Sequence, residues 1–559
     1  MILSTARTPP RRAPLNQANG ADLNRALRTH KSKNFGANGP SYPPSNFIVF
    51  VPYNMPVYMP IDPYTVRAPL RTPSRTTSVS RSRRVQLDAT PVPLSPLEKR
   101  FAQAQTYFDN EDTPKRALTF DRLPVELQVE IFTHCLTPLP TFNINEAPLT
   151  VSQVCSPWRS LVLFTPKLWS SFQIEVQGTG LPVSVRDLHV ITTMKLWLER
   201  SRNYPLSVRV VHTPVGRLPD TRSAQLLALL IPHARRWKYV EFVVPRPTML
   251  ALQDSMPDGF PALRSLTLQM KGLWHPTSPV DIRSFSIPWP QLTSLNLQLD
   301  SDQLLGLDEC LDILSEASNL THCTMNAECT FTSSGRRPEK VVLLNLERFH
   351  LRLQGGHSLG ISDSPESQLV AFLDTLSFYK LHSLRLDWLV QSNEGAQNWL
   401  GVHQSFVSFL NRQSASLETL RMSYLPIGEQ ALIDCVVQLP LLMKLDLRFS
   451  LGDNESDPIT DAFLKALTLP LCSGTMSDRV LVPLLESVYL QSHGSAFETG
   501  TLLDMIRSRW KLDNGHVTTQ KLRKFHLRSM RPASDEIQGW KTNCHEAGLD
   551  FVYDTVMLR

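Results

Sequence analysis

One serine lies in a sequence motif that is typical of a catalytic nucleophile. Residues 356–360 read G-x-S-x-G and follow the apolar run 346–351. In a nucleophile elbow this spacing places the serine hydroxyl on a sharp strand-to-helix turn, where it can attack an ester carbonyl. The elbow needs a helix directly after the serine, whereas Pro365 intervenes and the helical pattern begins only near Gln368. A surface turn is therefore the favoured interpretation, and an esterase-like enzyme that uses Ser358 is the alternative.

The other reactive side chains do not combine into a site. Three cysteines that could act as nucleophiles stand at core-facing positions of helical patterns, namely Cys135, Cys155 and Cys435. His322, Cys323 and Cys329 are close in sequence, but no CxxC or HxxxH pair completes a tetrahedral metal site. No glycine stretch has the spacing of a phosphate loop. We therefore expect no catalytic residue, no metal and no cofactor.

The elements that would position a site begin after a long polar tail. Residues 1–100 hold 15 of the 43 prolines, 15 Lys and Arg and 4 Asp and Glu, a local net charge of +11. The remaining 459 residues carry 42 basic and 47 acidic side chains, so the basic balance of the whole chain, +6, belongs to the tail. This composition predicts disorder over residues 1–95 and a linker over 96–117. The apolar stretch 47–64 in the tail is interpreted as linker, with a short docking motif as the alternative.

Composition excludes several classes of protein. No apolar run approaches the roughly 20 residues of a spanning helix, and the first residues lack the apolar core of a secretory signal. Eight cysteines in 559 residues are too sparse for a disulfide scaffold. We expect a protein of the cytoplasm or nucleus that binds neither membrane nor nucleic acid, since the basic charge is confined to the tail.

Residues 118–172 carry the pattern of a small helical domain. Pro124 suits the first position of a helix, where its missing N–H costs nothing. Apolar residues then recur with helical spacing from Leu127 to Leu136, and a second amphipathic stripe runs from Val151 to Val162. Pro166 opens a short third turn. The pattern predicts three short helices that leave apolar side chains in need of a partner.

The residue types within these helices resemble an F-box of the type common in large fungal families. The match rests on three clusters in the order and spacing of that family: Leu123-Pro124-x-Glu126-Leu127 with Ile131-Phe132, then Val154-Cys155-x-x-Trp158-Arg159, then Leu168-Trp169. The long loop 137–148 departs from the family pattern. A generic three-helix bundle is the alternative interpretation.

A second pattern repeats through the rest of the chain. An apolar-x-x-apolar-x-apolar hexamer starts at ten positions from Trp237 to Leu522, at intervals of 25 to 43 residues, with helical patterns between the starts. One strand and one helix per unit resembles an irregular leucine-rich-repeat horseshoe, an α/β solenoid. In that family, an Asn or Cys after each strand normally closes a ladder of internal hydrogen bonds. Here this position holds other residue types, among them Lys271, Glu328 and Leu425. We expect residues 173–205 to connect the two domains and residues 206–559 to form the solenoid; a doubly wound α/β domain is the alternative.

The two resemblances together imply an adaptor rather than an enzyme. F-box proteins dock onto the Skp-family adaptor of a cullin–RING ubiquitin ligase, and the domain behind the F-box holds a protein substrate. The residues expected to face this adaptor or to support the docking face are Leu123, Pro124, Leu127, Ile131, Val154 and Trp158. The first alternative is a repeat scaffold that binds the adaptor without a cullin, and the Ser358 esterase comes after it.

Alternation along each strand predicts the substrate surface. The residue between the last two apolar positions of each hexamer should project from the concave face. These residues are Glu241, Thr267, Asn296, Thr324, His350, Arg385, Arg421, Asp446, Tyr489 and His526. The basic run His350, Arg385 and Arg421 predicts a site for an acidic or phosphorylated segment, because arginine's fork suits such groups. A solvated face without a ligand is the other interpretation.

Overall fold

The structure is a computed structural model of the whole chain. It describes residues 120–177, 185–213, 222–255, 259–271, 279–331, 340–355, 364–390, 395–452, 457–470, 480–511, 519–546 and 548–556. Residues 1–119 lie outside this set, and so do the tail and linker predicted there. Ser358 lies outside it as well.

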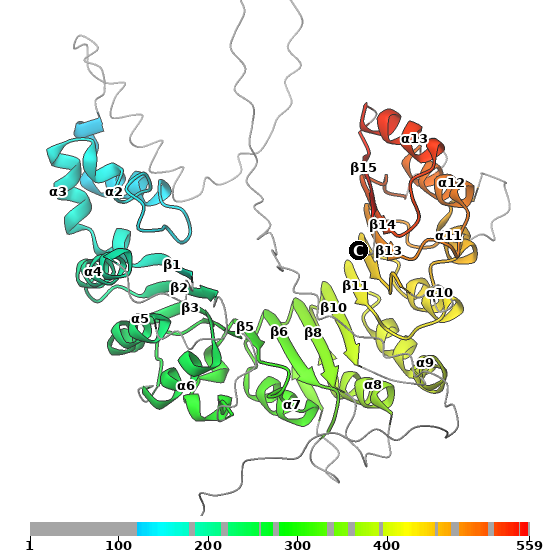
Figure 1. The fold of residues 1–559 in the computed structure, drawn as a ribbon, viewed down its shortest axis with the longest axis horizontal. Helices are drawn as coiled ribbons and strands as arrows, with labels where there is room; N and C mark the ends of the chain where they lie inside the picture. Colours follow the sequence, from blue (N-terminus) through cyan, green and yellow to red (C-terminus); the bar gives the residue numbers. More distant parts are fainter. Residues whose placement is uncertain are drawn as a thin grey trace, which may run out of the picture. The chain divides into compact units, whose positions relative to one another are not determined.

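The described part of the chain is built on one parallel sheet of 13 strands, which confirms the α/β fold class. Its strands lie side by side almost wholly in sequence order, which places each strand–helix unit next to the following one (Figure 1). The strands are β1 (Ser171–Gln177), β2 (Leu206–Thr213), β3 (Trp237–Val244), β4 (Ser265–Met270), β5 (Ser294–Gln298), β6 (His322–Glu328), β8 (Arg348–Gly355), β10 (Ser383–Val390), β11 (Thr419–Ser423), β12 (Lys444–Arg448), β13 (Ser487–Ser492), β14 (Lys524–Ser529) and β15 (Asp550–Thr555). Two short strands, β7 (Val341–Leu343) and β9 (Leu376–Phe378), pair separately.

The helices between the strands cover one face of this sheet (Figure 1). They are α4 (Val185–Arg200), α5 (Arg222–Leu230), α6 (Arg246–Ser255), α7 (Leu307–Glu316), α8 (Pro365–Thr375), α9 (Gly395–Arg412), α10 (Glu429–Val437), α11 (Asp461–Leu467), α12 (Thr499–Trp510) and α13 (Asp535–Glu546). Short 3-10 turns accompany them at η4 (Ile231–Arg236), η5 (Ile282–Phe285) and η6 (Trp289–Gln291). No described helix covers the other face, which we call the open face.

Alternation along the strands divides the side chains between the two faces. In β10, for example, Leu384 and Leu386 are buried beneath the helices, whereas Ser383 and Arg385 are half-buried on the open face. Each apolar side chain buried in this way contributes roughly 1.5–3 kcal/mol relative to exposure. The hexamer pattern thus forms the core between sheet and helices.

A continuous backbone ladder joins the units just before the strands begin. The carbonyl of Glu347 accepts hydrogen bonds from the backbone N–H groups of His382 and Ser383, at 2.9 and 3.0 Å. The carbonyl of Glu418 accepts two in the same way from Met443 and Lys444. The same pair of hydrogen bonds to one carbonyl recurs at each unit, from the carbonyl of Arg264 to that of Glu486. Because backbone groups form this ladder, it does not depend on the side chains at these positions.

Polar side chains also join neighbouring units, at the carboxyl ends of the strands. The Asn326 amide bonds both the N–H and the C=O of Leu299, at 2.8 and 2.6 Å. Gln491 Nε2 donates to the carbonyl of Phe449 at 3.1 Å, and Ser529 Oγ to that of His493 at 2.9 Å. At these three places the bonding side chains stand outside the positions that the repeat pattern assigned to a ladder.

The helical region before the sheet consists of η1 (Phe120–Arg122), α2 (Val125–His134), η2 (Val151–Gln153), α3 (Ser156–Phe164) and η3 (Pro166–Trp169). Its core contains an aromatic cluster in which the Trp158 ring lies 4.5 Å from that of Phe120 and 5.0 Å from that of Phe132. The buried Trp169 indole donates to the carbonyl of Val162 at 2.9 Å and lies edge-on to Trp197 of α4. These rings hold the short helices together and attach them to α4.

Residues 173–205 are not only a connection, because they contain most of β1 and all of α4. The sheet thus begins at Ser171 rather than at 206. The loop 137–148 packs against this first unit: the Phe142 ring lies 5.6 Å from Phe172 and 5.1 Å from Trp197. The loop 137–148, which departs from the F-box pattern, therefore packs the helical region against the first unit of the sheet.

Candidate functional site

The strand register places the ten predicted open-face residues in one row across the sheet. His350 is in register with Arg385, Arg385 with Arg421, and Arg421 with Asp446. Tyr489 continues the row on β13. Several residues of this row on β8 to β13, together with open-face residues two positions further along the same strands, form a network of ion pairs and hydrogen bonds.

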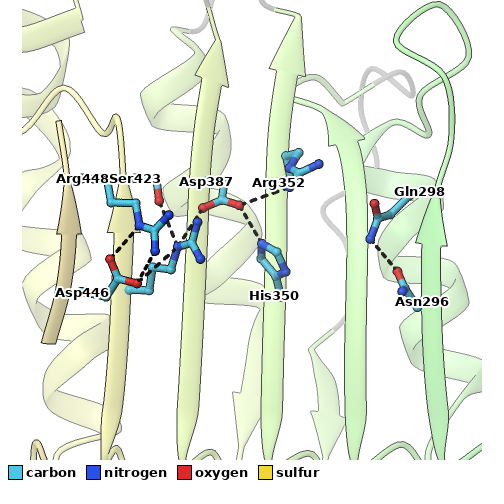
Figure 2. Close-up of polar contacts among 9 residues, drawn as sticks. Asn296, Gln298, His350, Arg352, Asp387, Ser423, Asp446 and Arg448 are labelled. Carbon is cyan, nitrogen blue, oxygen red and sulfur yellow. Dashed lines mark hydrogen bonds and ion pairs between the residues drawn. The ribbon is translucent and has the colours of Figure 1, made fainter. Parts of the chain in front are cut away.

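Asp387 of β10 is the centre of this network (Figure 2). Only 5% of its surface is exposed, and its Oδ2 lies 2.8 Å from His350 Nε2 and 3.7 Å from Arg352 Nη2. Its Oδ1 lies 3.5 Å from Arg421 Nε. Asp387 is thus a shared counter-ion for side chains on β8 and β11.

The network continues across β11 and β12. Arg421 Nε donates to Ser423 Oγ at 3.2 Å and lies 3.8 Å from Asp446 Oδ2. Arg448 donates to both carboxylate oxygens of Asp446, at 2.8 and 2.9 Å, in a bidentate pair (Figure 2). The Arg448 guanidinium also lies over the Tyr489 ring, 4.4 Å from its centroid. Two carboxylates therefore hold three arginines in place.

Burial and charge act together on the ionisable groups of this network. Burial lowers the pKa of His350, although the hydrogen bond to Asp387 opposes this, so His350 is neutral at pH 7 and donates its Nε2–H. Burial acts to raise the pKa of Asp387, but the His350 hydrogen bond and the positive charge of Arg421 outweigh it and hold this pKa well below its usual range. Asp387 therefore stays ionised, as a shared counter-ion must.

The three residues predicted to bind substrate thus differ in their surroundings. His350 is 7% exposed and Arg421 lies between two carboxylates, so both are occupied within the protein. Arg385 is half-buried and forms no hydrogen bond or ion pair with any residue that the structure describes. Alternation along the strands was enough to place all three on one face. It gave no indication that Asp387 pairs with His350 and Arg421.

The residues predicted to face an adaptor also fall into two groups. Pro124 is exposed, as are Ile131 and Val154, at 42% and 59%. Leu123 and Leu127 are half-buried. Trp158, also half-buried, packs against the aromatic cluster and supports the helices from inside.

Besides Ile144 of the loop 137–148, the helical region exposes two further large apolar side chains that were not predicted. Val125 and Phe164 are 55% and 70% exposed. Phe164 is the last residue of α3, two positions before Pro166, and its apolar type alone did not distinguish it from a core residue. Apolar side chains on α2 and α3 thus remain available to a partner.

Among the described residues, four cysteines are buried and no cluster of metal-ligating side chains occurs. Among them, no three His, Cys, Asp or Glu side chains are grouped so that they could hold a metal. Burial strongly raises the pKa of Cys310, Cys323 and Cys435, which opposes formation of a thiolate. No described helix is both long and apolar enough to cross a membrane.

Cysteine exposure gives a first testable prediction. Cys135 is exposed at the end of α2, contrary to the core position expected from its spacing, whereas Cys435 is buried. Brief alkylation of the native chain should label Cys135 ahead of Cys310, Cys323 and Cys435, because only an accessible thiol can react. Mass spectrometry of the labelled peptides measures the order, and labelling in denaturant provides the control. Equal rates in the native protein would contradict the packing described for the buried cysteines.

Comparison with known proteins finds similarity among solved structures rather than among sequences. No protein-family model and no curated protein matches the sequence. Among solved structures, a chain in the crystal structure of the Rad7 and Elc1 complex in yeast aligns with 73% of this chain and 96% of its own length. The identity is 12% and the TM-score 0.37, which is too low to indicate a shared fold.

Proposed function

We propose that this protein is the substrate-recognition adaptor of a Skp–cullin–F-box ubiquitin ligase, working in the cytoplasm or nucleus. Its helical region, residues 118–172, is the F-box that docks the Skp-family adaptor. The parallel sheet with its helices is an irregular leucine-rich-repeat-like solenoid that captures a protein substrate. The chain forms no covalent intermediate; it raises the concentration of a substrate lysine near the charged conjugating enzyme, and the substrate is then degraded.

One observation carries this proposal. The three clusters that resemble an F-box lie in compact short helices, and these helices expose Ile131, Val154 and Phe164. Large apolar side chains that are exposed on a small helical domain indicate a protein partner. Trp158 and Phe132, which belong to the same clusters, fill the core that presents them.

Charged substitutions at two exposed positions test the docking face. Ile131→Glu together with Val154→Glu should weaken adaptor binding at least about thirtyfold, because truncation of an apolar interface anchor typically costs about 2 kcal/mol. Titration of the purified Skp-family adaptor against the full chain, by calorimetry, measures the affinity. Because both side chains are exposed, the variant should fold normally.

A matched control comes from α4, where Leu188 is 57% exposed outside the F-box-like region. Leu188→Glu adds a carboxylate to an exposed apolar position and should leave adaptor binding unchanged. Normal adaptor binding by the Ile131 and Val154 double variant would contradict the docking face. If the wild-type chain binds the adaptor but recovers no cullin from cells, it is a scaffold rather than a ligase subunit.

A further inference from the structure

The open face is basic from β8 to β14, up to the acidic edge strand β15, whose open-face positions hold Asp550 and Asp554. From β8 to β14, this face carries eight cationic side chains against the two carboxylates Asp387 and Asp446, a net charge of +6 with histidine neutral. The eight are Arg348, Arg352, Arg385, Arg421, Lys444, Arg448, Lys524 and Arg528.

This charge does not reflect the average composition of the chain. From β1 to β6 the open face carries Glu175, Arg209, Glu241 and Glu328, a net charge of −2. Residues 101–559 together carry 42 basic and 47 acidic side chains. The basic residues are therefore concentrated on one part of one face.

Most of these cations have no ion-pair partner among the residues that the structure describes. Asp387 and Asp446 engage Arg352, Arg421 and Arg448. The other five form no hydrogen bond or ion pair with any residue that the structure describes: Arg348, Arg385, Lys444, Lys524 and Arg528. Like charges so placed repel one another, and an anionic partner would relieve that repulsion.

The spacing of the unpaired cations indicates several anionic groups rather than one. Arg348 and Lys444 lie three strands apart and Lys444 and Lys524 two strands apart, which corresponds to about 14 and 10 Å between backbones. An extended chain places alternate side chains about 7 Å apart, so acidic residues along it can match this spacing. The hydroxyls of Ser383 and Thr419 lie in the same row and offer further donors.

We propose that the open face of β8 to β14 binds an extended protein segment that carries several Asp or Glu residues and runs across the strands. That this segment belongs to a ubiquitylation substrate rests on the proposed function. Arg385 is a central contact, because it is the unpaired guanidinium between His350 and Arg421. Arg421, which the sequence also predicted, holds the network together instead.

The aromatic side chains of this surface favour a peptide over a nucleic acid. Single-stranded nucleic acid binds to basic grooves through aromatic rings on which its bases stack. On the open face of these strands, Tyr489 is covered by the Arg448 guanidinium and contacted at 4.6 Å by the His526 ring, and His350 is buried. The Tyr489 and His350 rings are therefore not open to a stacking base, and the His526 ring is paired with Asp554 at 2.7 Å.

Direct binding of defined probes to the full chain tests the proposal. The probes are a fluorescent twelve-residue peptide of alternating Glu and Ser, its Gln counterpart, and a twelve-nucleotide oligo-dT. Fluorescence anisotropy should show the Glu peptide binding at least about tenfold tighter than the Gln peptide, and more weakly as salt rises. Equal binding of the two peptides, or tighter binding of oligo-dT, would overturn the proposal.

A pair of charge-neutralising variants locates the site. Arg385→Gln with Lys444→Gln should weaken binding of the Glu peptide at least about tenfold. The control is Arg235→Gln with Lys465→Gln, which removes two cations from η4 and α11 and should change affinity less than about twofold. If both pairs weaken binding equally, the charge of the whole chain attracts the peptide and the assigned surface is wrong.

The outcomes separate this inference from the proposed function. A chain that binds the Skp-family adaptor but not the Glu peptide keeps its ligase assignment and loses the acidic-segment surface. A chain that binds the Glu peptide through Arg385 and Lys444 but not the adaptor keeps the surface and loses the ligase assignment.

Discussion

Replacing Arg509 with methionine should destabilise the repeat region by about 4 kcal/mol, because two buried carbonyls and one half-buried carbonyl would lose their donor. The Arg509 side chain is fully buried in α12. It donates to Leu467 at 2.5 Å, to Leu481 at 2.6 Å and to Val482 at 3.0 Å. Burial lowers its pKa to about 10, so it remains charged at pH 7. These bonds join the end of α11 to the chain that leads into β13.

Urea unfolding followed by tryptophan fluorescence measures this loss, since Trp510 is adjacent to the substituted residue. Arg507→Met is the matched control: it removes an arginine from the same helix whose side chain is 51% exposed and pairs with Asp504. That control should cost less than about 1 kcal/mol, as surface ion pairs usually do. Equal destabilisation by the two substitutions would show that the buried bonds of Arg509 contribute nothing particular.

Replacing Asp387 with asparagine should cost about 3 kcal/mol at pH 7, because it leaves Arg421 without its buried counter-ion. Asparagine has nearly the same shape, so the loss reports on charge rather than on packing. Asp446→Asn is the control, since the Asp446 side chain is 24% exposed and solvent can screen the change. Urea unfolding at pH 7 compares the two variants, and a larger loss at Asp446 would contradict the central role of Asp387.

The stability difference at Asp387 should also depend on pH. The pKa of Asp387 is lower in the folded chain than its ordinary value of 3.8, so its ionised form stabilises the folded state. This contribution is fully present above about pH 5 and is lost as the pH falls through 3.8 toward the folded-state pKa. The gap between wild type and Asp387→Asn should therefore be constant from pH 7 to 5 and shrink below pH 4. A gap that keeps its pH 7 size at pH 3 would show that ionisation is not its source.

Short-range patterns predicted the secondary structure well. Pro124 and the spacing from Leu127 onward predicted the helix found at α2, and the hexamers predicted strands whose apolar residues are buried. Each of these features depends on residues within one turn or one strand, where the spacing of apolar side chains already decides which face is buried.

Contacts between residues that are distant in sequence could not be predicted from such short-range patterns. Nothing in residues 173–205 matched the hexamer, yet β1 completes the first unit because it pairs along its whole length with β2. Likewise the loop 137–148, which read as an irregular insertion, is ordered by Phe142 packing on Phe172 and Trp197.

The same distinction between local pattern and tertiary contact applies to the candidate site. Alternation within each strand was enough to place His350, Arg385 and Arg421 on one face, because side chains of a strand point to opposite sides in turn. Which of them is free could be decided only by the register of three strands, which brings Asp387 against His350 and Arg421 and leaves Arg385 without a partner among the described residues. Local periodicity sets the direction of a side chain, whereas its charge partner comes from a segment about 35 residues away, and only tertiary structure brings the two together.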